Sequence, residues 1–435
     1  MSDSRQRGGS GGSSPLGDSR QRGESGGSSP LGGPSLRAAA VPPFAVMSIL
    51  GRVAELRAQG RDVISLCAGE PSSGAPSDVR RAMTQLMSGP TPLGYTETYG
   101  IRPLREAIAG HYARWYGLAL DPASVAVTTG SSGAFTLGFL AAFDPGDRVA
   151  LARPGYPAYR NILAALGCTV VELDCGPGHR FQPDVALLER AHAEAPLAGL
   201  VLASPANPTG TMVGAEALAA LAAWCRTNGV RLVSDEIYHG ITDDPDGGVG
   251  SCAWSHDRGG LVVSSFSKYW GMTGWRLGWC LVPEDLRDTV DALAGNFALC
   301  APVPAQHAAV AAFTDGSYAE AAAAVRTFAD ARRVALDGVA HLGWGAVAPA
   351  DGAFYVYAEL GEALGPYADA VAWCSALLEQ EGVALTPGTD FDRVRGGGAV
   401  RISLAAGPEA VAAALVRVHR FQRRTGGAAE PSSRH

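Results

Sequence analysis

Residues 264–278 of this 435-residue chain read SSFSKYWGMTGWRLG and contain Lys268, the only lysine of the sequence. The 35 lysines and arginines are otherwise all arginines. Arginine keeps its proton at ordinary pH, whereas a desolvated lysine can lose its proton and form an imine with a carbonyl group. A lysine-poor composition can also leave one lysine by chance, so the neighbouring residues have to decide between the two interpretations.

The neighbours of Lys268 favour a chemical role. The apolar run Leu261–Val263 precedes it and the run Trp279–Val282 follows it, and both are typical of buried strands. Lys268 is therefore expected on a loop between two strands, with Ser265 and Arg276 on either side of it. A hydroxyl and a permanent cation beside an imine-forming amine predict a pocket for an aldehyde cofactor that carries a phosphate.

The composition narrows the class of protein. Apolar residues make up 47% of the chain, charged residues 18%, and the formal net charge is −7. The chain has no basic run that would indicate a nucleic-acid partner, and no apolar stretch long enough to span a membrane. None of the eight cysteines forms a CxxC pair, and the histidines show no metal-ligand spacing. We therefore expect no metal site, and buried free thiols in a reducing cytoplasm.

The N-terminal region differs from the rest of the chain. DSRQRGGSGGSSPLG at residues 3–17 is repeated at residues 18–32 with a single change, Glu24 in place of Gly9. A Gly/Ser-rich segment without aromatic residues cannot bury a core, so residues 1–40 are expected to be a disordered tail. The tail lacks the apolar central region of a secretory signal.

From about Val41 onward, strand patterns alternate with helical ones, such as the Ala/Leu-rich stretch 215–227. This alternation predicts an α/β domain with a mostly parallel sheet. Helices mixed with short strands beyond residue 305 indicate a second, α+β lobe. The predicted strands are Val125–Thr128, Arg148–Ala152, Thr169–Leu173, Leu200–Ala203, Arg231–Ser234, Leu261–Ser264, Ala353–Tyr357 and Ala399–Leu404.

Parallel sheets bind ligands at the carboxyl ends of their strands, so the residues that follow each strand are the candidates. Gly130, Ser131 and Ser132 follow the strand 125–128 and open a helical run, where free N–H groups and the helix dipole favour an anion such as phosphate. Alone, a Gly/Ser loop is a weak signal. Tyr156, in a proline-stiffened turn after the strand 148–152, is interpreted either as core packing or as an aromatic cover for a flat cofactor.

Four further polar residues lie on or after predicted strands. Asn207 follows the strand 200–203 in a turn, Asp235 and Tyr238 follow the strand 231–234, and Arg401 lies on the strand 399–404. Asp235 could cap a helix or pair with a pyridinium nitrogen, which would make that ring an electron sink. Arg401 could form a surface salt bridge or grip a substrate carboxylate with two hydrogen bonds.

In this order, the motifs resemble those of the class I and II aminotransferases, which are pyridoxal-phosphate (PLP) enzymes of fold type I. The resemblance covers about residues 41–423 and is most specific at 204–211, 234–240 and 264–278. It implies a mostly parallel seven-stranded sheet in a large PLP-binding domain (71–305), a smaller α+β domain (41–70 and 306–424) and a disordered C-terminus (425–435).

The resemblance also implies a role for each candidate residue. Lys268 would form the imine with the cofactor and then act as general acid and base. Asp235 would pair with the ring nitrogen, and Arg401 and the backbone at Gly69 would contact the substrate carboxylate. The remaining residues would hold the cofactor: Tyr238 and Asn207 at the phenolic oxygen, Tyr156 on the ring, and Gly130, Ser131, Ser132, Ser265, Arg276 and Tyr95 of a partner subunit at the phosphate.

The implied activity is a ping-pong transfer of an amino group from an L-amino acid to a 2-oxo acid by a homodimer. Relatives specific for aspartate commonly use a second cation for the side-chain carboxylate, in one branch a lysine of the Gly-rich loop. This loop has no lysine, which favours neutral or aromatic donors, although an arginine elsewhere could substitute. A PLP-dependent C–S lyase, decarboxylase or racemase on the same fold stays open as an alternative. A catalytically silent relative is disfavoured because both Lys268 and Asp235 are present.

Overall fold

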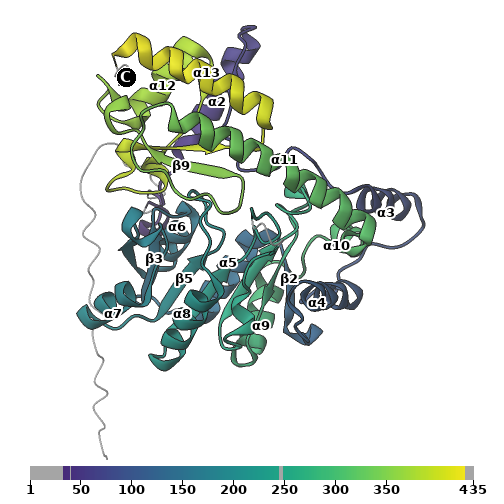
Figure 1. Cartoon of the computed structure of the whole chain (residues 1–435). Coiled ribbons are helices and arrows are strands. Elements are labelled where there is room, and N and C mark those ends of the chain that lie inside the picture. The colour runs from purple at the N-terminus through teal and green to yellow at the C-terminus, as the bar shows by residue number, and fades with distance from the viewer. Residues whose placement is uncertain (1–32, 40, 244–247, 427–435) are drawn as a thin grey trace, which may run out of the picture.

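The computed structural model describes residues 33–39, 41–243 and 248–426 of the chain (Figure 1). Most of the predicted disordered tails, 1–40 and 425–435, falls outside these residues. Within the N-terminal tail, Leu36–Ala39 form a short helix, α1, so the chain is helical there rather than unstructured.

The large sheet has seven strands in the order β2-β8-β7-β6-β5-β3-β4. All neighbouring strands are parallel except where β8 pairs with β2 and β7, so the prediction of a mostly parallel seven-stranded sheet is confirmed. The strands are β2 (Val125–Thr128), β3 (Arg148–Arg153), β4 (Thr169–Asp174), β5 (Gly199–Ala203), β6 (Arg231–Asp235), β7 (Leu261–Ser265) and β8 (Gly278–Leu281).

Helices cover both faces of this sheet, which is why its strands are apolar on both sides. The helices α5 (Gly130–Ala142), α6 (Pro157–Leu166) and α9 (Arg287–Phe297) lie on one face, and α4 (Arg102–Tyr116), α7 (Val185–Glu194) and α8 (Ala215–Thr227) lie on the other. Successive residues of β6 alternate between the two cores: Leu232 packs on the α8 side and Val233 on the α5 side. Asp235 and Glu236, which follow Ser234, therefore lie on opposite faces of the sheet.

A smaller lobe lies at the carboxyl edge of the large sheet (Figure 1). Its antiparallel sheet has the order β11 (Thr386–Pro387), β12 (Ala399–Ser403), β9 (Tyr355–Glu359), and β1 (Ile64–Ser65) pairs with β10 (Val383–Ala384) nearby. The helices of this lobe are α2 (Ala45–Ala58), α12 (Ala370–Glu381) and α13 (Pro408–Thr425).

The long helix α11 (Asp315–Ala340) connects the two parts. It runs from the vicinity of α3 (Ser77–Ser88) and α10 (Val303–Ala309) to the smaller lobe (Figure 1). Residues 319–325 have a helix-favouring composition and lie within α11. The domain boundaries at residues 71 and 305 remain a prediction, because strand pairings describe sheets and not domain limits.

The predicted strand Ala353–Tyr357 was placed two residues too early. Ala350 and Ala353 have positive φ values of 55° and 54°, and the amide of Gly352 donates to the carbonyl of Gly210 at 2.8 Å. The chain therefore turns across residues 350–353, and β9 begins at Tyr355.

Candidate active site

Lys268 follows β7 and lies at the wall of a pocket between the two lobes. Its Nζ donates a hydrogen bond of 2.6 Å to the carbonyl of Gly69, which lies in the segment that follows β1 of the small lobe. The pocket has a volume of about 480 Å³ and is lined by Leu50, Ala68, Gly69, Glu70, Ser267, Lys268, Thr273, Gly274 and Arg276. The predicted position of Lys268, on a loop between two buried strands, is confirmed.

The surroundings of Lys268 favour the neutral amine. Burial, the Arg401 guanidinium and, to a smaller extent, Arg276 lower its pKa to about 8, while Asp235 and Glu70 act in the opposite direction. At this pKa both protonation states are populated near neutral pH, as a group that accepts and returns a proton requires.

Asp235 ends β6 and is only 2% exposed. Its Oδ2 accepts a hydrogen bond from the hydroxyl of Tyr159 on α6, and its Oδ1 accepts one from the amide of Ile237 at 3.1 Å. Burial raises the pKa of Asp235 to about 6, although both hydrogen bonds and Lys268 lower it. No helix begins at this position in the described chain, so the alternative role of Asp235 as a helix cap is wrong.

Tyr238 follows Asp235 in the same turn and is buried. Its hydroxyl lies 3.0 Å from the hydroxyl of Tyr355 on β9, and Lys268 Nζ lies 5.8 Å from the centre of its ring. Tyr238 therefore stands between the lysine and a strand of the smaller lobe.

Arg401 is held in place on β12 by residues from four other segments. Its Nη1 donates to Oδ1 of Asn207 at 2.9 Å, and its Nη2 donates to the carbonyl of Cys67 at 2.9 Å. The rings of Tyr355 and Phe391 lie 4.5 Å and 4.9 Å from its Cζ. Its Nε, although buried, has no hydrogen-bond partner among the described residues.

This arrangement excludes one of the two interpretations of Arg401. The residue is 5% exposed, and no carboxylate of the described chain pairs with it, so the surface salt bridge is wrong. A buried guanidinium with an unpaired donor costs free energy unless an anion reaches it. The oxygen of the Asn207 amide is occupied by Arg401, which leaves the nitrogen of that amide for another partner.

The Gly/Ser loop lies against Arg276. Thr129 precedes α5, which begins at Gly130, and no side chain caps its free N–H groups. Gly130 has a φ of 67°, and a Cβ at this position would collide with the guanidinium of Arg276. Arg276 itself has a φ of 52° and donates from Nη1 to the carbonyl of Thr273 at 2.9 Å. Helix N–H groups and a guanidinium at one place suit a phosphate group.

The three serines predicted at the phosphate differ in burial and in hydrogen bonding: Ser131, Ser132 and Ser265. Ser131 is half-buried and Ser132 is exposed on the first turn of α5. Ser265 is fully buried, and its hydroxyl donates within its own loop to Ser267 Oγ at 2.8 Å or to the carbonyl of Leu277 at 3.2 Å. The Ser265 hydroxyl therefore stabilises the conformation of the loop that carries Lys268.

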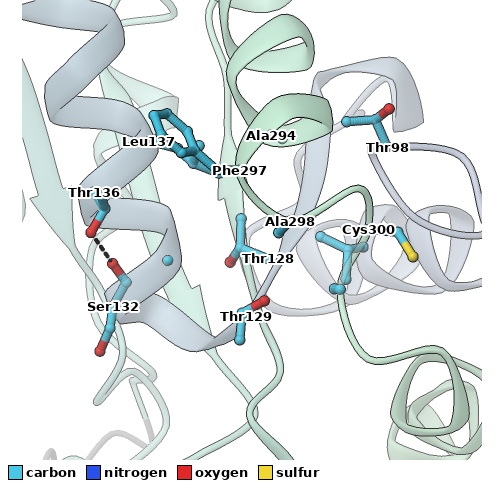
Figure 2. A pocket seen from close by; sticks show the side chains of 13 residues that line it. Thr98, Thr128, Thr129, Ser132, Thr136, Leu137, Ala294, Phe297, Ala298 and Cys300 are labelled. Atoms are coloured by element: carbon cyan, nitrogen blue, oxygen red, sulfur yellow. Dashed lines mark hydrogen bonds between the residues drawn. The ribbon is translucent and has the colours of Figure 1, made fainter.

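A second pocket, of about 320 Å³, lies next to the Gly/Ser loop (Figure 2). Thr128, Thr129 and Ser132 line it from the β2–α5 turn, and Phe297 and Cys300 line it from the end of α9 and the segment that follows. Phe297 is 66% exposed, so this pocket opens onto an apolar patch of the surface.

Tyr156 and Tyr95 differ in how they relate to the rest of the site, since Asp235, Arg401 and Arg276 all act on the pKa of Tyr156. Tyr156 stands before α6 and is half-buried, with its ring 5.4 Å from that of Tyr159. Tyr95 is 82% exposed, and none of its contacts within the described chain ties it to Lys268 or to Arg276. Its predicted role requires a partner subunit and stays a prediction.

The sequence analysis missed Tyr159 and Tyr355. Tyr159 stands three residues after Tyr156, one helical turn along α6, and this spacing could have drawn attention to it. Tyr355 carries no sequence signal, because its contact with Tyr238 arises from packing between the lobes and its contact with Arg401 from the pairing of β9 with β12.

Among residues 33–39, 41–243 and 248–426, no group of three or more His, Cys, Asp or Glu side chains is placed to hold a metal ion. In the same residues, no helix has the length and apolar character needed to cross a membrane. All eight cysteines are free thiols, and Cys300 alone among them is not buried.

Comparison with known proteins agrees with this geometry. Residues 61–418 match the model of the family described as aminotransferase class I and II. A valine–pyruvate aminotransferase from Mycobacterium tuberculosis is 51% identical over 87% of this chain and 96% of its own length. An aspartate/prephenate aminotransferase from Thermus thermophilus is 35% identical over 89% of this chain and 98% of its own length. The crystal structure of an aminotransferase from Mycobacterium tuberculosis superposes with a TM-score of 0.86 at 50% identity, and the match covers 90% of this chain and 99% of that one.

Proposed function

The chain belongs to the class I and II aminotransferases and is an enzyme of fold type I that transfers amino groups, and we propose that it does so with PLP as cofactor and neutral aliphatic L-amino acids as donors. The observation that carries the cofactor proposal is the junction of Lys268, Asp235 and Arg276 at the edge of one sheet. An amine with a lowered pKa, a buried carboxylate and a guanidinium beside a helix N-terminus match the aldehyde, the ring nitrogen and the phosphate of PLP.

Each group of the cofactor is proposed to contact residues already described. Asp235 would hold the ring nitrogen, Tyr238 and the Asn207 amide nitrogen the phenolic oxygen, and Tyr156 the face of the ring. The phosphate would be bound by Gly130, Ser131, Ser132, Ser265 and Arg276. The space that Gly130 leaves for the Arg276 guanidinium supports the phosphate position, because any larger residue would close it.

The cofactor, when bound, supplies a carbonyl that forms imines with amines and a ring that takes up the electrons of a broken bond at the α-carbon. The chain's own residues supply position and proton transfer. Arg401 binds the α-carboxylate through its unpaired Nε–H and the backbone at Gly69 lies beside it, while Lys268 Nζ takes the α-proton and returns it. The donor leaves as a 2-oxo acid before the acceptor binds in the same pocket, which is a ping-pong sequence.

The substrate class follows from the relatives and the pocket. The relative at 51% identity is a valine–pyruvate aminotransferase, which supports a neutral aliphatic donor. The pocket walls include the apolar Leu50 and Ala68, and Glu70 adds a carboxylate beside Lys268 that would repel a second carboxylate of a substrate. A valine-like donor with pyruvate or a similar acceptor is therefore proposed.

Two further properties complete the proposal. A homodimer is supported by the exposed side chains of Tyr95, Phe297 and Leu299, which are 82%, 66% and 50% exposed, and of these Phe297 lines the second pocket. A cytoplasmic location is supported by the eight free thiols, which a reducing compartment would preserve. Light scattering of the purified protein measures the first property directly.

One experiment tests the activity and the cofactor together. Single L-amino acids are added, without any 2-oxo acid, to the PLP-loaded protein while the visible spectrum is recorded. Valine is expected to remove the yellow absorbance and to release one equivalent of its 2-oxo acid per site. A protein that stays yellow and releases ammonia or a decarboxylated amine would contradict the proposal and favour the lyase or decarboxylase alternative, and racemised valine would favour the racemase.

The control is Lys268→Ala, which should bind PLP weakly and lose at least about 10⁴-fold in turnover because both the imine and the proton acceptor are gone. Full turnover in this variant would overturn the proposed role of Lys268.

A further inference from the structure

Tyr355 joins the two binding groups of the proposed site. It is the first residue of β9 in the smaller lobe, and its side chain is fully buried. Its hydroxyl lies 3.0 Å from the hydroxyl of Tyr238, which follows β6 of the large sheet. Its ring lies 4.5 Å from Cζ of Arg401. One side chain therefore contacts both the proposed cofactor donor, Tyr238, and the proposed carboxylate clamp.

Only one of the two hydroxyls, that of Tyr238 or that of Tyr355, can donate in the hydrogen bond that joins them. Each tyrosine has one hydroxyl proton, and only one proton can lie between the two oxygens. Neither hydroxyl has another hydrogen-bond partner among the described residues. The side chain of Tyr355 is fully buried, whereas that of Tyr238 keeps a small exposed fraction of 4%. If Tyr238 donated to Tyr355, the Tyr355 proton would remain buried and unpaired, at a cost of about 1–3 kcal/mol.

The lower-energy arrangement has Tyr355 as the donor. Tyr238 then accepts at its oxygen, and its own proton is free to point into the site, where Lys268 Nζ lies 5.8 Å from its ring. A hydroxyl that accepts one hydrogen bond also becomes a stronger donor of the next, because the bonds in a chain polarise one another.

We infer that Tyr355 is a positioning residue, which directs the Tyr238 proton toward the cofactor and supports Arg401 with its ring. The inference rests on the proposed function, since it needs the phenolic oxygen of PLP as the acceptor of the Tyr238 proton. A donor at that oxygen draws off negative charge that would otherwise hold a proton on the Lys268 nitrogen. Tyr355 therefore tunes the acidity of that nitrogen through Tyr238, without touching it.

The test is a pH titration of the visible absorbance of the PLP-loaded protein. Tyr355→Phe removes only the hydroxyl and should raise the titration midpoint by about 0.5 pH unit, and Tyr238→Phe should raise it further. Because Tyr355 acts through Tyr238, adding Tyr355→Phe to Tyr238→Phe should cause no further shift. An additive shift in the double variant, or no shift in Tyr355→Phe alone, would overturn the inference.

Kinetics separate the ring from the hydroxyl. Tyr355→Phe keeps the ring on Arg401, so the KM for the amino donor should change by less than about twofold. Tyr355→Leu removes that ring and should raise the KM several-fold, with the same titration midpoint as Tyr355→Phe.

The matched control is Tyr357→Phe, on the same face of β9 two residues further on, where the side chain packs against Phe181 and Phe391. It should leave the midpoint unchanged, and a shift equal to that of Tyr355→Phe would point to a general effect of the strand and overturn the assignment. Failure of the proposed function is recognised separately: the wild-type protein would then show no yellow species that depends on Lys268.

Discussion

Two neighbouring carboxyl groups, Asp235 and Glu236, show how little burial says about function. Each residue is 2% exposed at the end of β6, and in each case burial is the largest cause of a raised pKa, to about 6 for Asp235 and about 7 for Glu236. By exposure and pKa alone, Glu236 would be the stronger candidate for a functional group.

The two side chains differ in what they face. Asp235 lies on the α5 side, accepts from Tyr159 and Ile237, and is close enough to Lys268 for the amine to lower its pKa. Glu236 lies on the α8 side, where Oε1 accepts from the amide of Ala253 at 2.7 Å and from Ser234 at 3.1 Å.

Its other oxygen, Oε2, lies 3.5 Å from Nδ1 of His239 and has no hydrogen-bond partner among the described residues. Burial lowers the pKa of His239 to about 3, so this histidine is neutral and offers no charge to Glu236. The nearby amine of Lys268, and not burial, therefore distinguishes the candidate catalytic carboxyl from the structural one.

The largest expected effect comes from exchanging each carboxyl for its amide. Asp235→Asn should lower kcat/KM by about 10³-fold, because an amide cannot hold the ring nitrogen in its protonated form. Glu236→Gln, the matched control one residue away, should change kcat/KM by less than about threefold. Steady-state kinetics on both variants, with thermal melting to verify folding, checks the pair. Equal losses in the two variants would break the comparison.

A smaller effect is expected in stability, and here the order reverses. The pKa of Glu236 is raised on folding from an ordinary value of 4.5 to about 7, so its contribution to the free energy of unfolding is complete below pH 4.5 and is lost as the pH rises to about 7. In Glu236→Gln this loss should be absent. Between pH 4.5 and pH 8, the free energy of unfolding of wild type should therefore fall by on the order of 2 kcal/mol more than that of the variant.

Urea unfolding of both proteins without cofactor, at a series of pH values, measures this difference. The comparison with wild type is needed because His111 and His239, whose pKa values are lowered to about 3, weaken the protein as the pH falls below 6.5. Parallel stability curves for the two proteins would show that Glu236 is not protonated in the folded state.

The smallest effect concerns the hydroxyl of Tyr159. The hydrogen bond from Tyr159 lowers the pKa of Asp235, so Tyr159→Phe should raise that pKa and move the acidic limb of the kcat/KM profile to higher pH. Turnover at neutral pH should fall by about tenfold or less. A profile that keeps its acidic limb while turnover falls would mean that Tyr159 acts on something other than Asp235.

The sequence predicted the sheet well because buried parallel strands are short apolar runs. Val125–Thr128 was placed at its observed bounds, and most other strands of the large sheet differ by one residue. The strand at Tyr355 was misplaced because two alanines, Ala350 and Ala353, adopt a left-handed conformation that composition does not reveal.

Only those residues of the candidate site that belong to a local sequence motif could be predicted. Lys268, Asp235 and Arg276 each follow a strand or lie in the lysine loop, and the sequence analysis identified all three. Tyr159 and Tyr355 are 76 and 117 residues away from the partners that they contact, Asp235 and Tyr238. Such contacts depend on how a helix and a strand pack, and no local pattern encodes them.

The hydrogen bond between Lys268 and Gly69 has a practical consequence for anyone who handles this protein. Since the sequence has no other lysine, the amine at the wall of the 480 Å³ pocket is its only side-chain amine, and therefore its only side-chain target for reductive alkylation. Apart from the amino group at the start of the chain, a mass increment on the intact protein thus reports a single position. Lys268 is therefore a single labelling site. The degree to which a ligand protects it from modification measures how much of the pocket is filled, without any assay of turnover.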